Sequence, residues 1–363
     1  MVTELEPAAR GLSLAGTPLP RFDRAPSNPM GASPPRRPGS ARRTSSIDVA
    51  WPDGRDGLAA IAADARDILT PLIGGVPQVL AQDHADIRAD HRVIRSVASM
   101  PPRPQLAQLA GARAGGHLRA ALDAALHEER LAGTPLYLLL DDLAGATLVA
   151  PWAWSRWSDD WMPTRSREEI ETHLSQMEGI CIGFRPGSGA LGQDGRPRPE
   201  QNATRVPPLP HPDDVEGWHA LPDRGGVNFR RARRIDVWRE DGLIHIDSAF
   251  QDSASAPDGG DRIAIHEYRL TATADGDAKI LLSVAATAGT LPFAECPAAP
   301  SNIVAMIGTP LRELRQAVLL TLRRTAGCTH LNDAVRALAE VPRLAASLAE
   351  SSGRDASERN SLA

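Results

Sequence analysis

The chain is short of lysine, aromatic residues and excess charge of either sign. Lys279 is its only lysine, so arginine supplies nearly all of its 40 basic residues, against 45 acidic ones. The formal net charge of −5 gives no general attraction to nucleic acid or to acidic lipid. We therefore expect no nucleic-acid partner.

Long apolar runs and cysteines are also scarce. No uninterrupted run reaches the roughly 20 apolar residues that a membrane helix needs, and the N-terminus has no apolar core of the kind that a signal peptide requires. The three cysteines are an odd number and lie far apart, which argues against a disulfide framework. These absences predict a cytoplasmic protein that does not insert into a membrane.

The first half of the chain predicts a disordered tail followed by a helical region. Residues 1–52 are rich in Pro, Arg, Ser and Gly and carry too little apolar surface to offset the entropy of ordering. In residues 53–191, Leu58, Ile61 and Ala65 recur at helical spacing. Short apolar runs at 135–140 and 179–184 are typical of buried strands, so that we expect a helical or mixed, Trp-rich domain.

The second half is more regular. Residues 192–226 are rich in proline and predict a linker, and residues 349–363 predict a disordered tail. Within 227–348, alternating residues flank Asp241-Gly242, a strong hairpin signal, and two more strands and three helices follow. We find no internal repeat. The expected fold class is therefore α+β, with a mainly helical N-terminal region and a C-terminal antiparallel sheet followed by three helices.

The segment Cys328-Thr329-His330-Leu331-Asn332-Asp333 places four chemically useful side chains where a loop becomes a helix. Unpaired backbone N–H groups at a helix start favour a thiolate, which is a nucleophile and a metal ligand. With Cys296 from an upstream loop, Cys328 and His330 form a candidate site for zinc or iron that leaves a coordination position open. Their spacing matches no standard zinc motif. The alternatives are a thiol nucleophile, or two small buried residues beside a helix cap at Thr329.

A second group of candidates lies on a predicted strand. Alternation places His266 and Tyr268 on one face, where they could serve as general base and proton donor. A polar strand face with one hydrogen-bonded histidine is the alternative. The candidate catalytic residues are therefore Cys328, His330, His266, Tyr268 and Asp333.

Four of the seven tryptophans lie within ten residues. Trp154, Trp157 and Trp161 follow helical spacing and are interleaved with charged residues. Such amphipathic rings line apolar ligand sites, so they are candidates for binding a hydrophobic small molecule. Packing in the core is the alternative.

The stretch 231–344 resembles a bacterial family known only as a domain of unknown function. The resemblance depends on Arg233-Arg234-Ile235-Asp236-Val237, His266-Glu267-Tyr268, Leu291-Pro292-Phe293-Ala294-Glu295-Cys296-Pro297 and the Cys328–Asp333 segment. Longer members of the family look like proteins encoded near genes for the breakdown of aromatic or steroid-like compounds in soil bacteria. The resemblance implies this context and no mechanism.

These observations predict an enzyme of small-molecule catabolism that acts on a hydrophobic, aromatic or steroid-like compound. Lyase, hydratase or hydrolase chemistry fits best, because no nucleotide-binding fingerprint is present and no cofactor beyond zinc or iron is indicated. The alternatives are a non-catalytic metal or iron–sulfur protein and a ligand-binding accessory subunit. Whether the chain forms a homo-oligomer stays open.

Overall fold

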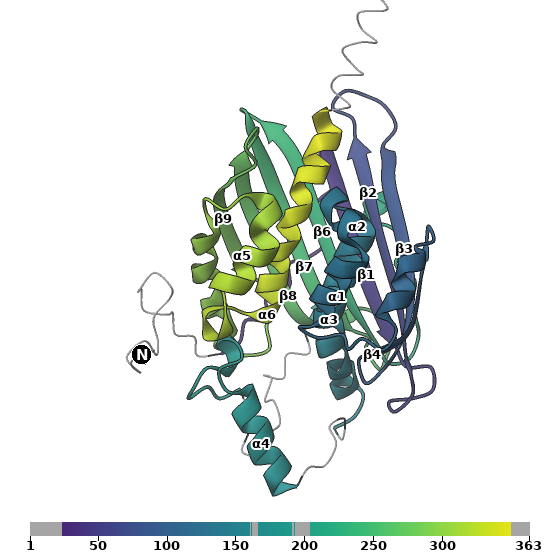
Figure 1. The fold of residues 1–363 in the computed structure, drawn as a ribbon, viewed down its shortest axis with the longest axis vertical. Coiled ribbons are helices and arrows are strands. Elements are labelled where there is room, and N and C mark those ends of the chain that lie inside the picture. Colours follow the sequence, from purple (N-terminus) through teal and green to yellow (C-terminus); the bar gives the residue numbers. More distant parts are fainter. Residues whose placement is uncertain (1–23, 160, 162–165, 191, 193–203, 350–363) are drawn as a thin grey trace, which may run out of the picture.

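The computed structural model describes residues 24–159, 161, 166–190, 192 and 204–349. In these ranges the chain forms one antiparallel sheet of nine strands, and helices cover one of its faces (Figure 1). The strand order is β4-β3-β2-β1-β6-β7-β8-β5, and β9 also pairs with β8. The strands are β1 (Ser40–Ala50), β2 (Ala59–Thr70), β3 (Gln78–Asp90), β4 (Val93–Met100), β5 (Arg205–Val206), β6 (Asn228–Glu240), β7 (Leu243–Ala254), β8 (Arg262–Asp275) and β9 (Leu281–Ala288).

Two α-helices, one from each half of the chain, pack on the sheet. The N-terminal one, α3, contacts β1, β2 and β3, and the C-terminal one, α6, contacts β7 and β8. The α-helices are α1 (Leu118–Ala125), α2 (His127–Ala132), α3 (Pro135–Val149), α4 (Arg167–Met177), α5 (Leu314–Thr321) and α6 (Thr329–Arg336). The 3₁₀ helices are η2 (Pro104–Leu109), η3 (Ala150–Arg156), η4 (Ile182–Phe184), η5 (Val215–Gly217), η6 (Cys296–Met306), η7 (Leu311–Glu313), η8 (Arg324–Ala326) and η9 (Ala337–Glu340).

The prediction of a mainly helical N-terminal region is wrong. Residues 59–100 form β2, β3 and β4, and β1 lies within the stretch 1–52 that composition assigned to a disordered tail. Along β2, Ile61, Ala63 and Ala65 are buried while the residues between them are partly exposed. The same residues that suggested helical spacing therefore follow the period of two of a strand, because alanine fits either pattern.

The run at 135–140 is the start of helix α3 and not a strand. Thr134 caps the helix by accepting a hydrogen bond from the backbone N–H of Tyr137, and Pro135 takes the first position, where no N–H is required. Residues Pro135–Arg156 are long and apolar enough to cross a membrane by composition, but most of their apolar window is buried inside the protein. The run is therefore apolar because α3 is a core helix.

The hairpin predicted around Asp241-Gly242 is confirmed. It joins β6 to β7, and both turn residues have positive φ, 50° for Asp241 and 76° for Gly242, as a tight hairpin turn requires. Strands β8 and β9 follow in the expected order, and helical segments complete the C-terminal part. These strands, however, continue the sheet of the N-terminal half and do not form a sheet of their own.

The chain contains two copies of one structural repeat, which the sequence did not reveal. A four-stranded meander followed by helices occurs twice, as β1–β4 with α1–α3 and as β6–β9 with α5 and α6. Both copies shift register at matching points: after Asp67 and Asp252 in one strand pair, and after Arg88 and Thr273 in the next. The two copies are therefore built on the same plan.

The copies join through the antiparallel pair β1–β6. Arg42 lies opposite Asp236, and Asp48 lies opposite Arg230, so that the pairing is reciprocal about an approximate twofold axis near Ser45. Both pairs are bidentate and buried. The largest fully buried side chains include five arginines of these two strands, Arg42, Arg43, Arg231, Arg233 and Arg234, so the centre of the sheet is ionic and not apolar.

Candidate functional site

The sheet and helix α6 bring one carboxylate and two imidazoles together under the helices. Asp252 on β7 lies opposite His266 on β8, at the bulge that shifts the register of these strands. Bulges redirect side chains and are frequent beside active sites. His330 reaches the same place from the first turn of α6, whose N-cap is Cys328.

The distances within this cluster are short. His266 Nδ1 lies 3.4 Å and His330 Nε2 lies 3.9 Å from Asp252 Oδ2. The two rings stack with centroids 3.5 Å apart and planes 19° apart. Among the described residues, one ligand atom from each of Asp252, His266 and His330 lies within 4.8 Å of the other two, an arrangement that could hold a metal ion.

Arg231 on β6 fixes the carboxylate. Its Nε and Nη2 donate to the two oxygens of Asp252 at 2.8 and 2.9 Å, and its Nη1 donates to Asp333 at 3.3 Å. Burial alone would raise the pKa of Asp252, but the charge and the hydrogen bonds of Arg231 outweigh it and hold the pKa well below its usual value. Asp252 is therefore an anion.

The imidazoles are neutral and have free nitrogens. Burial lowers the pKa of His266, and burial together with the neighbouring His266 lowers that of His330. Within the described part of the protein, His266 Nδ1 and His330 Nε2 are buried without a hydrogen-bond partner. These two nitrogens are the atoms that face Asp252. The cluster therefore contains ring nitrogens that could bind a ligand and that no hydrogen bond within the described residues occupies.

The three cysteines lie near Tyr268: burial raises the pKa of its hydroxyl, and each cysteine raises it further. The Tyr268 hydroxyl donates to Cys328 Sγ at 3.5 Å, and Cys328 Sγ lies 3.8 Å from His330 Nδ1. The sulfurs of Cys296 and Cys181 both lie within 4 Å of the position that a Cβ on Gly183 would take. All three are free thiols.

The helix start does not make Cys328 a thiolate. Burial raises the pKa of its thiol and outweighs the hydrogen bonds from the backbone N–H groups of the helix start and from Tyr268. Burial also raises the pKa of Cys296, and it raises that of Cys181 to about 12. The thiols are therefore protonated near neutral pH.

The predicted metal set of Cys296, Cys328 and His330 stays a prediction, but among the described residues another set converges. Asp252, which the sequence analysis missed, joins His266 and His330, with one ligand atom of each within 4.8 Å of the others. Asp333 pairs with Arg231 at 3.3 Å and with Arg119 at 3.0 Å. Asp333 thus belongs to the buried ionic layer.

The three candidate tryptophans, Trp154, Trp157 and Trp161, pack against different partners. Trp154 packs on Trp51 with centroids 5.7 Å apart, Trp161 packs on Trp152 at 6.4 Å, and the indole N–H of Trp157 donates to the Ser255 carbonyl. Trp154 and Trp161 line a cavity of about 460 Å³ that includes none of the predicted Cys or His residues. The ring of Trp152 lies 6.1 Å from that of His266 and so borders the Asp252, His266 and His330 cluster.

The two repeats share the buried ion pair of this cluster but not its histidines. The ion pair Arg231–Asp252 has its counterpart in Arg43–Asp67, with the same bidentate geometry. By contrast, the position opposite Asp67 is Ala81, and the position two residues after the helix cap Thr134 is Leu136. The first repeat therefore builds the same structure with apolar residues where the second has His266 and His330.

The fold and the cluster thus define a two-repeat antiparallel sheet protein with an Asp/His group in its second repeat. A family model described as "protein of unknown function (DUF2889)" matches residues 229–343, which lie within that repeat. The resemblance to a domain of unknown function is confirmed for this part of the chain. No curated protein and no solved structure matches the chain.

Proposed function

We propose that the protein binds one divalent transition-metal ion, zinc or iron, through Asp252, His266 and His330, and uses it in the breakdown of a hydrophobic small molecule. The convergence of three buried ligand atoms within 4.8 Å carries this proposal. Donor atoms about 2.1 Å from a tetrahedral zinc ion lie about 3.4 Å apart. The spacing of His266 Nδ1 and Asp252 Oδ2 is 3.4 Å.

The donor set favours catalysis over storage. Two imidazoles and one carboxylate occur in zinc hydrolases and in non-haem iron enzymes, where they leave coordination positions for water and substrate. Arg231 fills two of the roughly four acceptor positions of Asp252 and leaves the others for a metal. The His330 side chain is 13% exposed, so that one edge of the site reaches solvent.

The repeat supports a functional role for the histidines. A buried polar atom without a partner costs stability, and the first repeat shows that Ala81 and Leu136 can fill these positions. The histidines are thus not needed to complete the fold. We infer that a ligand satisfies them.

Metal analysis of anaerobically purified protein tests the proposal. We expect about one zinc or iron per chain, lost in His266→Ala and in His330→Leu, each of which introduces the first-repeat residue. The melting temperature of metal-free His330→Leu should equal or exceed that of the metal-free wild type, because an apolar residue replaces an unsatisfied polar one. As a matched control, His219→Gln changes another buried histidine on the opposite face of the sheet and should retain the metal.

The cobalt-substituted protein separates a catalytic from a non-catalytic site. An open coordination position predicts that azide changes the visible absorption spectrum of bound Co²⁺. If the protein binds Co²⁺ but azide does not change its spectrum, the metal site is a storage or structural site. Absence of metal, or full metal content in both histidine variants, would disprove the proposed ligand set.

A further inference from the structure

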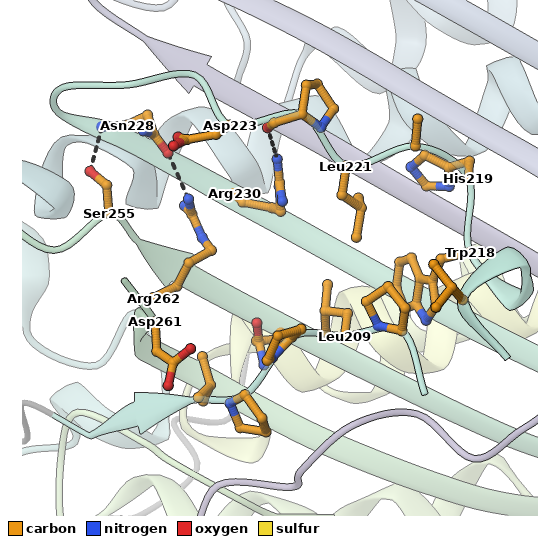
Figure 2. Close-up of a pocket in the computed structure, with 18 of the residues that line it drawn as sticks. Leu209, Trp218, His219, Leu221, Asp223, Asn228, Arg230, Ser255, Asp261 and Arg262 are labelled. Carbon is orange, nitrogen blue, oxygen red and sulfur yellow. Dashed lines mark hydrogen bonds between the residues drawn. The ribbon is translucent and has the colours of Figure 1, made fainter. Parts of the chain in front are cut away.

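A cavity of about 1000 Å³ lies on the face of the sheet opposite the helices. Alternation along the strands separates the two faces: Arg230 and Gln251 line the cavity, whereas their neighbours Arg231 and Asp252 belong to the site under the helices. The segment 204–226 forms its outer wall. Figure 2 shows Leu209, Trp218 and Leu221 of this wall around the strands that carry Arg230 and Arg262.

The outer wall is held in place by hydrogen bonds. The indole of Trp218 donates to Ser33 Oγ at 2.9 Å, and the carbonyl of Leu209 accepts from the Ser33 backbone at 2.8 Å. His219 lies between the hydroxyls of Thr44 and Ser46, 2.9 Å from each. The cavity therefore has an ordered wall on the side away from the sheet.

Arg262 is the unusual residue in this cavity. Its guanidinium bonds only to neutral oxygens: Ser253 Oγ at 2.9 Å, the Ser253 carbonyl at 3.0 Å and Asn228 Oδ1 at 2.7 Å (Figure 2). In the described ranges no carboxylate oxygen lies within 4 Å of it. Burial, together with the charge of Arg230, lowers the pKa of Arg262 to about 10 against the weaker attraction of Asp48 and Asp223, so the group stays a cation at neutral pH.

Among the described residues no carboxylate pairs directly with Arg262; Asp48 and Asp223 attract it only from beyond 4 Å. Arg230 pairs with Asp48, and Arg36 pairs with Asp214. Arg66 bonds to the backbone carbonyls of Glu216 and Trp218, with no carboxylate within 4 Å among the described residues. The side chains of Glu216, Asp223 and Asp261 line the cavity from exposed positions. The interior is therefore cationic, and the acidic groups lie at the rim.

The walls between the charged groups are apolar. Leu209, Leu221, Val206 and several prolines of the 204–226 segment line the cavity. Ligand sites combine an apolar lining with a few placed polar groups, and pockets of 300–1000 Å³ hold drug-sized molecules. A buried cation gains most from an anionic ligand that binds it bidentately, as a carboxylate does.

We propose that this cavity binds an apolar carboxylic acid, with its carboxylate on the guanidinium of Arg262 and its apolar body against Leu209, Trp218 and Leu221. The site is separate from the proposed metal site, because the sheet lies between them. A ligand of this class agrees with the breakdown of hydrophobic compounds, but the cavity would bind it whether or not the protein holds a metal.

Two fluorescent probes that differ only in the head group test the proposal. Fluorescence anisotropy titrations with 1-pyrenebutyric acid and with its neutral analogue 1-pyrenebutanol give the Kd of each for the full chain. We expect the acid to bind at least tenfold more tightly than the alcohol. Equal affinities in the wild type, or no binding of either probe, would overturn the proposal without the use of any variant.

Variants test which residues bind the carboxylate of the probe and which bind its apolar body. Arg262→Met should reduce the preference for the acid to about onefold and leave binding of the alcohol unchanged. Leu221→Trp fills the cavity and should weaken both probes at least tenfold. Arg88→Met removes an exposed arginine of β3 and should change neither. If Arg66→Met abolishes the preference while Arg262→Met retains it, the assignment to Arg262 is wrong. Metal-free His330→Leu should bind both probes as the wild type does.

Discussion

At the scale of single residues, the sequence revealed part of the candidate site. His266 and His330 stand out because histidine beside tyrosine or cysteine is chemically versatile. Asp252 did not, because a lone carboxylate in a strand carries no spacing signal, and its position opposite His266 depends on a bulge. The only sequence signal for Asp252 was its counterpart Asp67 in the first repeat, and using it required recognising the repeat.

The expectation for Cys328 shows which physical effect was underestimated. The sequence placed it correctly at the start of a helix, where backbone N–H groups favour a thiolate. It did not show that the residue is only 3% exposed. Loss of solvation outweighs the helix start, so that a local motif alone did not predict the protonation state.

His219 gives a prediction about pH. Burial, with the nearby charges of Arg66 and Arg230, lowers its pKa from 6.5 to about 3. Between these values the unfolded chain binds a proton on this residue and the folded protein does not, so the free energy of unfolding falls as the pH falls. The slope is at most about 1.4 kcal/mol per pH unit.

The variant His219→Gln removes this titration and can still bond to Thr44 and Ser46. Urea denaturation of both proteins at pH 7, 6 and 5 measures the effect. The wild type should lose about 2 kcal/mol more than the variant between pH 7 and 5. Parallel losses in the two proteins would show that His219 is protonated in the folded state.

At the scale of secondary-structure elements, short-range signals were reliable and propensities were not. The turn at Asp241-Gly242 is encoded by the two residues that form it, and the hairpin was predicted correctly. The alanine-rich β2 looked helical because alanine favours helices. Its strand conformation results from pairing with β1 and β3, which lie at other places in the sequence.

Gly145 in α3 tests how closely that helix packs on the buried ionic layer. A Cβ at this position would lie 2.2 Å from Arg231 Nη1 and 2.4 Å from Asp333 Oδ2. Helix propensity alone predicts that Gly145→Ala stabilises the protein by about 1 kcal/mol. We expect it instead to destabilise by at least about 2 kcal/mol, because it displaces a buried ion pair.

Thermal and urea unfolding of Gly145→Ala measure this effect. Ala124→Gly on the exposed side of α1 is the control and should cost about 1 kcal/mol by propensity alone. Gly145→Ala and Ala124→Gly are opposite changes, and we expect each of them to destabilise the protein. A stabilised Gly145→Ala variant would mean that α3 lies farther from Arg231 than the structure places it.

At the scale of the whole molecule, the sequence carried the repeat in a few residues only. Arg42-Arg43 and Ile47-Asp48-Val49 correspond to Arg230-Arg231 and Ile235-Asp236-Val237. These short matches lie 188 positions apart and outside any regular period, so composition and periodicity did not reveal them. The structure makes them meaningful, because these residues form the reciprocal pairing that joins the two repeats.

That pairing predicts that the two repeats unfold together. Asp48 accepts from Arg230 at 2.6 and 2.9 Å across the β1–β6 junction, and both side chains are buried. Asp48→Ala leaves the guanidinium buried without this partner, a change that costs about 3–5 kcal/mol. Native-state hydrogen exchange should show equal losses of protection for amides of β3 in one repeat and β8 in the other.

The control is Asp258→Ala, which removes an exposed partner of Arg205 and should change the protection of both strands by less than about 1 kcal/mol. A loss confined to the strands of the first repeat would show two independent folding units, divided as the Pro-rich segment 192–226 suggested; equal losses show that one ionic junction stabilises the whole sheet.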